Sequence, residues 1–393
     1  MTYENPYINS STWTELNILE TLRKRNPLII CITNDVVRTF TANGLLAIGA
    51  SPVMSECSED LKDLIAHASA LLINIGTLTP DKVSYYKDAI ALAKKHEVPI
   101  VLDPVGCHAG VYRLSVVLDL IKTGAISLLR GNQSEIKAIY DALNTNHKID
   151  SSLSGKGVDG EQVEDSAIIT YRLARQINCP VVATGEEDYV SDGTRVFAVP
   201  HGHPIMTAVT GTGCLLGAVL AAFFSSYCPF MDNMSIGEFL AYALAYYGLA
   251  SESAVNVSGV KPGSFSMAFM DALYEFDDAM LLSENRIRPV VVPDQLKVYF
   301  ISGTQDVGFN ESHLLDIVEA ACRGGATCFQ FREKGIGTLE GQQKLELAQQ
   351  LKEICAMYNV LYIINDDVDL AVAVNADGVH VGQEDMRLED VRN

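Results

Sequence analysis

Short apolar runs alternate with helix-like stretches along most of this 393-residue chain, and this alternation limits the possible folds more than any other feature. A continuous apolar run that ends in polar residues is typical of a strand buried on both faces of a sheet. Strands separated by helices predict an α/β fold, with a parallel sheet covered by helices on both faces. The expected strands are 27–34, 50–54, 70–75, 100–103, 126–130, 181–184 and 196–199, and the expected helices are 14–24, 39–48, 59–67, 80–96, 112–123, 133–141 and 162–177.

Polar or functional side chains stand where these predicted strands end. In open α/β sheets, ligand-binding groups gather beyond the carboxyl ends of the strands. Asp103 and the later Glu135 are carboxylates of the kind that hold Mg²⁺, usually through water, beside substrate phosphates. Arg130 offers planar donors that suit phosphate oxygens. Either carboxylate alone is more often a helix cap or a surface ion-pair partner, so the hypothesis rests on the joint appearance of Asn34, Met54, Asn74, Asp103, Arg130 and Thr184.

A glycine-rich turn, residues 207–213, leads into an apolar helix expected at 214–226. The first N–H groups of a helix have no internal partner and carry the positive end of the helix dipole, so such a turn suits a phosphate. The glycine spacing fits neither the dinucleotide fingerprint nor the P-loop. A tight turn with close helix packing is the alternative. Together with the carboxylates, the turn favours phosphoryl transfer, which needs mainly positioning and charge neutralisation.

Charge and cysteine usage exclude several classes of protein. The formal net charge of −20 argues against nucleic acid or an anionic membrane as the main partner. The longest apolar run, 215–224, is too short to span a bilayer. The nine cysteines contain no C-x-x-C pair, which is typical of reduced core thiols. We therefore expect a cytoplasmic protein with small-molecule substrates, and the length allows two domains.

Residues 14–282 resemble hydroxyethylthiazole kinase, a member of the ribokinase-like superfamily. The resemblance implies transfer of phosphate from ATP, with Mg²⁺, to the hydroxyl of 4-methyl-5-(2-hydroxyethyl)thiazole in thiamine biosynthesis or salvage. The family is typically trimeric, with sites between subunits. The segments that carry the resemblance are 32–34, 51–54, 102–106, 130–135, 183–185, 210–214 and 261–265, the last of which precedes a helix expected at 266–282.

The resemblance also implies residue roles. It places Met54, Gly211 and Asn34 at the thiazole, Arg130, Thr184 and Asn132 at ATP, Asp103 and Glu135 near the metal, and Thr212, Gly213 and Cys214 at the reacting groups.

Cys214 stands where many ribokinase-like enzymes carry a catalytic aspartate. A helix N-terminus lowers the pKa of a thiol, so a Cys214 thiolate could accept the proton of the hydroxyl. The alternative is that the anion-binding turn does most of the catalysis and that Cys214 only lies beside the hydroxyl.

A second strand–helix series follows the predicted linker 283–296, which contains Pro289 and Pro293. Basic and acidic groups again end the strands, and together they suit a magnesium diphosphate. The expected strands are 298–301, 327–332, 360–366 and 378–382, the expected helices are 311–323, 339–358 and 369–374, and the strand-end residues are Gln330, Arg332, Lys334, Asn365, Asp366, Gln383 and Asp385.

This second segment resembles thiamine-phosphate synthase, a (β/α)₈ barrel, through 330–334, 364–366 and 378–385. The resemblance implies that Gln330, Arg332, Lys334 and Asn365 bind hydroxymethylpyrimidine diphosphate, and that Asp366 and Asp385 bind Mg²⁺. The sequence extends only into the fourth of eight strand–helix units, so we expect a truncated half barrel that does not catalyse the condensation by itself.

The sequence therefore predicts a kinase domain over 1–282, a linker over 283–296 and a partial thiamine-phosphate synthase domain over 297–393. One alternative is a ribokinase-like kinase of another small alcohol, such as a pyrimidine methanol. The other is a non-catalytic protein that binds thiamine precursors. That alternative would leave four residues without a purpose, namely Asp103, Glu135, Arg130 and Thr184.

Overall fold

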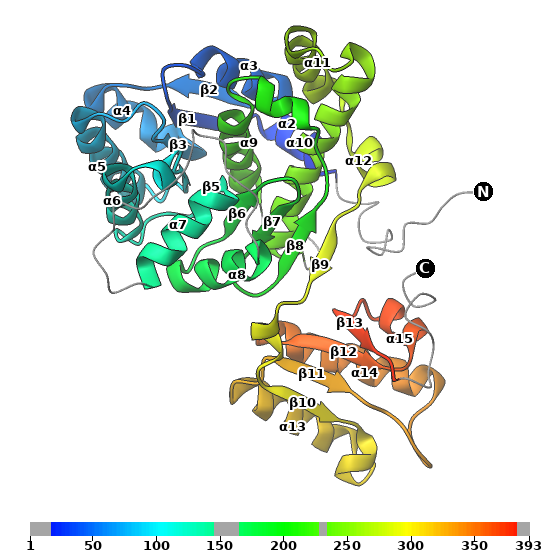
Figure 1. Cartoon of the computed structure of the whole chain (residues 1–393). Helices are drawn as coiled ribbons and strands as arrows, with labels where there is room; N and C mark the ends of the chain where they lie inside the picture. Colours follow the sequence, from blue (N-terminus) through cyan, green and yellow to red (C-terminus); the bar gives the residue numbers. More distant parts are fainter. Residues whose placement is uncertain (1–16, 145–164, 228–233, 383–393) are drawn as a thin grey trace. The chain divides into compact units, whose positions relative to one another are not determined.

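The computed structural model describes residues 17–144, 165–227 and 234–382. The chain forms two compact units that divide between Val290 and Val291, and each is described by itself (Figure 1).

The first unit is built on a nine-stranded sheet with the order β2-β1-β3-β4-β5-β6-β7-β8-β9. The strands from β2 to β6 are parallel, as the sequence predicts, whereas β7, β8 and β9 pair antiparallel. The strands are β1 (Leu28–Ile32), β2 (Ser51–Met54), β3 (Ala70–Asn74), β4 (Ile100–Asp103), β5 (Leu128–Asn132), β6 (Val181–Thr184), β7 (Asp188–Ser191), β8 (Val196–Val199) and β9 (Arg288–Val290).

Helices cover both faces of this sheet (Figure 1). One face carries α4 to α8, whose apolar side chains join those of the strands in one core. On the other face α9 packs against β1, β3 and β4, and α10 packs against β7 and β8. The helices are α2 (Ile18–Arg25), α3 (Arg38–Ile48), α4 (Ser58–Leu64), α5 (Pro80–Lys95), α6 (Val111–Ile121), α7 (Gln133–Asn144), α8 (Ser166–Ile177), α9 (Thr212–Ser226), α10 (Ile236–Ser258), α11 (Pro262–Glu275) and α12 (Asp278–Glu284).

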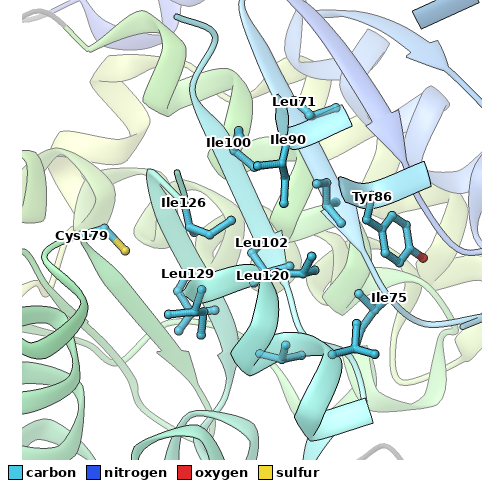
Figure 2. Close-up of a cluster of buried hydrophobic side chains, with 14 of the residues drawn as sticks. Leu71, Ile75, Tyr86, Ile90, Ile100, Leu102, Leu120, Ile126, Leu129 and Cys179 are labelled. Atoms are coloured by element: carbon cyan, nitrogen blue, oxygen red, sulfur yellow. The ribbon is translucent and has the colours of Figure 1, made fainter. Parts of the chain in front are cut away.

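The core between the sheet and α4–α8 follows from the alternation of side chains along each strand. Leu71, Ile100 and Leu102 point to this face, where they meet Ile90 of α5 and Leu120 of α6 (Figure 2). Burying each such side chain contributes about 1.5–3 kcal/mol. The alternate residues of these strands, which include Asp103 and Arg130, therefore point to the opposite face, toward α9.

Helix α9 begins two residues earlier than predicted, at Thr212, because Gly211 is its N-cap and has a φ of +103°. A Cβ at Gly213 would lie 3.6 Å from Nη2 of Arg130, and a Cβ at Gly217 would lie 3.2 Å from Oδ2 of Asp103. Residues four apart lie on the same face of a helix. The two glycines thus let α9 approach the ends of β4 and β5 closely.

Three other elements differ from the sequence prediction. Helix α10 is buried along most of its length, so it lacks the polar stripe by which a helix is recognised. Strand β7 was also not predicted. The helix expected at 266–282 is two helices, α11 and α12, because the side chain of Asp277 caps a new helix by accepting a hydrogen bond from the N–H of Met280. Within the described ranges, no helix has both the length and the hydropathy needed to cross a membrane.

Part of the predicted linker 283–296 belongs to the first unit. Arg288–Val290 forms β9, which pairs antiparallel with β8 and closes that end of the sheet. Proline does not prevent this pairing, because an edge strand can leave one side without ladder bonds. A 3₁₀ turn follows at Pro293–Leu296.

The second unit has four parallel strands in the order β10-β11-β12-β13, at the predicted positions. Its helices α13, α14 and α15 pack with Phe329, Phe331, Tyr362 and Ile364 in a separate core. Asp385 lies outside the described residues. The elements are β10 (Tyr299–Ser302), α13 (Glu311–Arg323), β11 (Cys328–Phe331), α14 (Gly341–Met357), β12 (Leu361–Asn365), α15 (Val368–Ala373) and β13 (Gly378–His380).

Candidate active site

A row of polar side chains crosses the carboxyl ends of β4, β5 and β6. Nη1 of Arg130 lies 3.5 Å from Oδ1 of Asp103, and Nη2 of Arg130 donates a hydrogen bond to Oγ1 of Thr184 at 3.0 Å. Asp103 is fully buried and Arg130 almost so. Parallel register brings the three together, since all three strands end at the same edge of the sheet. The structure thus brings together three of the predicted site residues.

The Asp103 carboxyl is held in an unusual state. Burial raises its pKa to about 7, against the opposing effect of the Arg130 guanidinium, and the negative charge of Glu135 adds to the rise. Within the described part of the chain, Oδ1 of Asp103 and Nε of Arg130 are buried and accept or donate no hydrogen bond. Groups of this kind in a buried site mark a place where a ligand can complete the bonding.

Two asparagines link Asp103 to the start of α9. Nδ2 of Asn74 donates to Oδ2 of Asp103 at 2.7 Å, and Nδ2 of Asn34 donates to Oδ1 of Asn74 at 3.0 Å. The same nitrogen of Asn34 donates to Sγ of Cys214 at 3.3 Å. The strand-end residue Asn74, for which the sequence suggested no role, therefore joins Asn34 and Asp103.

The thiol of Cys214 differs from the sequence-based expectation. Burial, followed by the negative charge of Asp103, raises its pKa to about 11, although hydrogen bonds from Asn74 and Asn34 act in the other direction. The helix dipole alone predicts a lowered pKa, but desolvation outweighs it here. Cys214 is thus a neutral thiol at physiological pH.

Glu135 supports two loops from the first turn of α7. Its Oε1 accepts a hydrogen bond from the N–H of Gly106 at 2.6 Å, and its Oε2 accepts one from the N–H of Asn132 at 2.7 Å. Oδ1 of Asn132 in turn accepts from the N–H of Glu135 at 2.8 Å. This is the reciprocal arrangement of a helix cap. Each carboxylate oxygen keeps a second lone pair that can still meet a metal-bound water.

The remaining predicted residues lie around the start of α9 and the edge strand β2. Gly211 packs under α3, because a Cβ there would lie 3.1 Å from Phe40 and 3.2 Å from Val37. The hydroxyl of Thr212 donates to the carbonyl of Met206 at 2.8 Å within the preceding turn, so it serves the local fold. Met54 ends β2, beside β1, and is half-buried.

Asp188, at the start of β7, is a site residue that the sequence analysis missed. Its Oδ1 accepts a hydrogen bond from the N–H of Gly185 at 2.9 Å, which closes the turn after Thr184. Burial raises its pKa to about 7, and Arg130 opposes this rise. In the sequence, Asp188 is recognisable only as a carboxylate four residues after Thr184. Its place at the site follows from the antiparallel pairing of β6 with β7, which the sequence does not reveal.

A second cluster ends the strands of the C-terminal unit. Nε2 of the buried Gln330 donates to Oδ1 of Asn365 at 3.1 Å, and Nδ2 of Asn365 donates to Oδ2 of Asp366 at 2.7 Å. Nζ of Lys334 lies 2.7 Å from the same Oδ2. The side chain of Arg332 is exposed. Four predicted residues, Gln330, Lys334, Asn365 and Asp366, are thus joined. Over all described residues of the chain, no group of three or more His, Cys, Asp or Glu side chains is placed so that it could hold a metal ion.

The fold and the first site together define a class of protein. A parallel sheet covered by helices on both faces meets a helix start, where a buried aspartate, an arginine and free main-chain N–H groups converge. These groups can bind phosphates and neutralise charge. They define a phosphotransferase of the ribokinase-like type.

Comparison with known proteins identifies the family. Residues 19–279 match the model of the Hydroxyethylthiazole kinase family, and the chain belongs to this family. Residues 298–393 match the model of Thiamine monophosphate synthase. These matches confirm both resemblances seen in the sequence.

Individual relatives agree. The chain is 48% identical over 267 residues to the hydroxyethylthiazole kinase of Streptococcus agalactiae serotype Ia, which covers 68% of this chain and 99% of that protein. It is 47% identical over 256 residues to that of Streptococcus suis, covering 65% and 93%. The solved structure of the hydroxyethylthiazole kinase from Pyrococcus horikoshii OT3 is 36% identical, covers 70% of this chain and 98% of that chain, and superposes with a TM-score of 0.61.

Proposed function

We propose that the first unit transfers the γ-phosphate of ATP to the hydroxyl of 4-methyl-5-(2-hydroxyethyl)thiazole. The observation that carries this proposal is the row formed by Asp103, Arg130 and Thr184 beside the start of α9. A buried cation next to free N–H groups suits a phosphate that gains charge during transfer. The family membership of residues 19–279 supports the choice of alcohol.

The proposed binding roles follow the positions of the side chains. Arg130 and Thr184, joined by a hydrogen bond, bind ATP phosphates from the ends of β5 and β6, with Asn132 beside them. On the other side of α9, Asn34, Met54 and Gly211 bind the thiazole alcohol; Asn34 follows β1 and Met54 ends the neighbouring β2. The two groups of residues flank the N-terminus of α9, so the reacting atoms meet there.

The N-terminus of α9 stabilises the transferring group in this proposal. The N–H groups of Gly213 and Cys214 lie in the first turn of the helix, where no intrahelical acceptor is available. The negative charge shed by the γ-phosphate is stabilised by these donors and by Arg130. Because Cys214 is a neutral thiol, its proposed role is to lie beside the hydroxyl, and the role of obligatory base is the weaker alternative.

The residues present fit a magnesium ion bound through water. Oδ1 of Asp103 is buried and accepts no hydrogen bond from the described residues, so it can accept one from a metal-bound water. Glu135 can do the same with its second lone pairs while its caps stay intact. Mg²⁺ keeps several waters and uses only one or two carboxylates beside substrate phosphates. When bound, the ion would neutralise phosphate charge.

We further propose a homotrimer, as in the family that the sequence resembles. Exposed apolar side chains gather on α3 and on the neighbouring α11, namely Leu46, Met267 and Tyr274. Such a surface favours association between subunits. Light scattering after size exclusion tests this, and a monomeric mass would contradict it.

A reaction that consumes ATP also points to the cytoplasm as its location.

For the second unit we propose binding of hydroxymethylpyrimidine diphosphate by Gln330, Arg332, Lys334 and Asn365. Gln330, Asn365 and Lys334 are linked at the strand ends, the last two through Asp366, and the exposed Arg332 directly follows β11. Asp366 and Asp385 are the proposed metal ligands, the latter outside the described residues. Calorimetric titration with the diphosphate and Mg²⁺ tests this, with Lys334→Met as the variant expected to bind at least tenfold more weakly.

An ADP-release assay with three alcohols tests the proposed kinase. ADP release with the thiazole alcohol is expected. Release only with the pyrimidine alcohol or with pyridoxal would make the protein a kinase of another alcohol. No release with any of the three would favour a binding protein. Arg130→Met serves as the matched inactive variant, since Met keeps the length of the side chain but not its charge.

A further inference from the structure

Asn74, the last residue of β3, is fully buried, and its partners allow only one orientation of its carboxamide. Its Oδ1 accepts a hydrogen bond from the main-chain N–H of Gly76 at 3.0 Å, and its Nδ2 donates to the carboxylate of Asp103 at 2.7 Å. A main-chain N–H can only donate, so the N–H of Gly76 fixes which end of the carboxamide is the oxygen, and the NH₂ group is left to face Asp103. A flipped Asn74 would face a donor with its NH₂ and an acceptor with its oxygen.

The orientation of Asn74 determines that of Asn34. Oδ1 of Asn74 accepts from Nδ2 of Asn34 at 3.0 Å, and Nδ2 of Asn34 also donates to Sγ of Cys214 at 3.3 Å. An amide nitrogen carries two hydrogens, so these two bonds use both of them. The main chain at Gly76 passes close to this side chain, since a Cβ at Gly76 would lie 2.8 Å from both Cβ and Nδ2 of Asn34, and only glycine leaves space for Asn34 there.

With both N–H groups of the Asn34 side chain in use, its carbonyl oxygen, Oδ1, is the atom that remains to accept a hydrogen bond from a ligand. The described residues donate no hydrogen bond to it, and it belongs to a side chain that touches Cys214 at the first turn of α9. A carboxamide oxygen has two lone pairs and is a good acceptor for an alcohol O–H. It cannot take up the proton at neutral pH, so its effect is on the direction of the hydroxyl.

We propose that Asn74 is a positioning residue, which holds the Asn34 carboxamide so that Oδ1 of Asn34 accepts a hydrogen bond from the hydroxyl group of the alcohol substrate. That hydrogen bond turns the O–H away from the phosphate and leaves a lone pair of the alcohol oxygen free to attack. The inference rests on the proposed function, since it requires the alcohol to bind beside Cys214. Asn74 itself does not touch the alcohol in this proposal and acts only by orienting Asn34.

Binding measurements without nucleotide or metal test this directly. The affinity of the thiazole alcohol is compared by calorimetry with that of 5-ethyl-4-methylthiazole, which lacks only the hydroxyl. The wild-type protein should bind the alcohol roughly three- to tenfold more tightly, the effect of one net hydrogen bond. This preference should disappear in both Asn34→Ala and Asn74→Ala, and the double variant should show no further change.

The ratio of the two affinities separates positioning from general damage. A loosened pocket weakens both ligands alike and leaves the ratio as in the wild type, which would overturn the proposal. A preference lost in Asn34→Ala but kept in Asn74→Ala would also overturn it. Thr170→Val, which removes a buried hydroxyl on α8, is the control and should keep the preference. If the wild type does not bind the alcohol, the proposed function fails; binding with no dependence on either asparagine overturns only this inference.

Discussion

Two carboxyl groups, the buried Asp103 and the half-buried Asp188, lie near Arg130, and their charges determine what a substitution at Arg130 would do. Burial raises the pKa values of Asp103 and Asp188 to about 7, and Arg130 counteracts the rise in both. Removing the Arg130 guanidinium would leave the carboxyl group of Asp103 buried without its positive partner, which is destabilising. Arg130 is therefore expected to be needed for stability as well as for binding.

Arg130→Met should destabilise the protein more at pH 8.5 than at pH 5.5. In the folded wild type the pKa of Asp103 lies near 7, above its ordinary value of 3.8, so stability falls as pH rises toward 7. Removing Arg130 raises this pKa further. At pH 5.5 Asp103 is mostly protonated and little is lost, whereas at pH 8.5 breaking a buried pair costs about 3–5 kcal/mol. Thermal melts at both pH values measure the difference, and an equal loss at both would contradict this account.

Cys214→Ala should lower kcat by less than about tenfold. A general base contributes typically about 10²–10⁴-fold to the rate, and the pKa of Cys214, about 11, leaves almost no thiolate at pH 8. ADP release at saturating substrates measures kcat. A thousandfold loss in the alanine variant would assign the base role to the thiol. A faster Cys214→Asp variant would show that proton transfer can occur at this position.

Among the elements, α9 has the greatest effect on the site. Its glycines at 213 and 217 lie against Arg130 and Asp103, and Gly211 lets the chain turn into the helix at a φ of +103°. Residues with a Cβ avoid such a φ. The position of the main-chain N–H groups at the start of α9 thus depends on glycine both at the turn into the helix and along its first turns.

Gly211→Ala should lose both stability and activity, whereas Gly259→Ala should lose stability only. Both positions have a positive φ, +103° and +63°, so each alanine costs roughly 1–2 kcal/mol. A Cβ at Gly211 also meets Val37 and Phe40, while a Cβ at Gly259 meets nothing within 4 Å. Melting temperature and kcat/KM of the two variants provide the comparison. Unchanged kcat/KM in Gly211→Ala would show that the turn is not part of the site.

At the scale of the whole molecule, each unit has its own sheet and core. The division lies between Val290 and Val291, after β9 has added to the first sheet. Near β9, the N–H of Arg286 donates to Nε2 of the buried His201 at 3.0 Å, and Nη2 of Arg286 lies 3.0 Å from Oε1 of Glu252. The end of the first unit is thus tied to β8 and α10.

A protein cut after residue 290 should keep the kinase activity and the stability of the first unit, and one cut after residue 282 should not. The shorter protein loses β9 and the contacts of Arg286, and it leaves the edge of β8 uncovered. We expect its melting temperature to be lower by at least about 5 °C. Scanning calorimetry and ADP release measure both proteins. Equal melting temperatures would place the domain boundary at the predicted residue 282.

Much of the fold was predictable because it depends on local patterns. The parallel strands β1–β6 and most helices follow from apolar runs and their spacing, and polar strand ends indicated Asp103, Arg130 and Thr184. Strand β9 was not predictable, because three residues that include a proline show no strand pattern, and only the pairing with β8 identifies them as a strand. Helix α10 was not predicted because, once buried on all sides, it shows no amphipathic pattern.

The sequence alone determined the order of strands and helices, the residue types at their ends and the family, since these depend on neighbours along the chain. The tertiary structure decided which of those residues interact. Asn34, Asn74 and Asp103 are 40 and 29 residues apart, and only the register of the parallel strands joins them. It also decided the state of Cys214: a helix start by itself lowers the pKa of a thiol, but burial beside Asp103 raises it, because desolvation is a property of the packed interior.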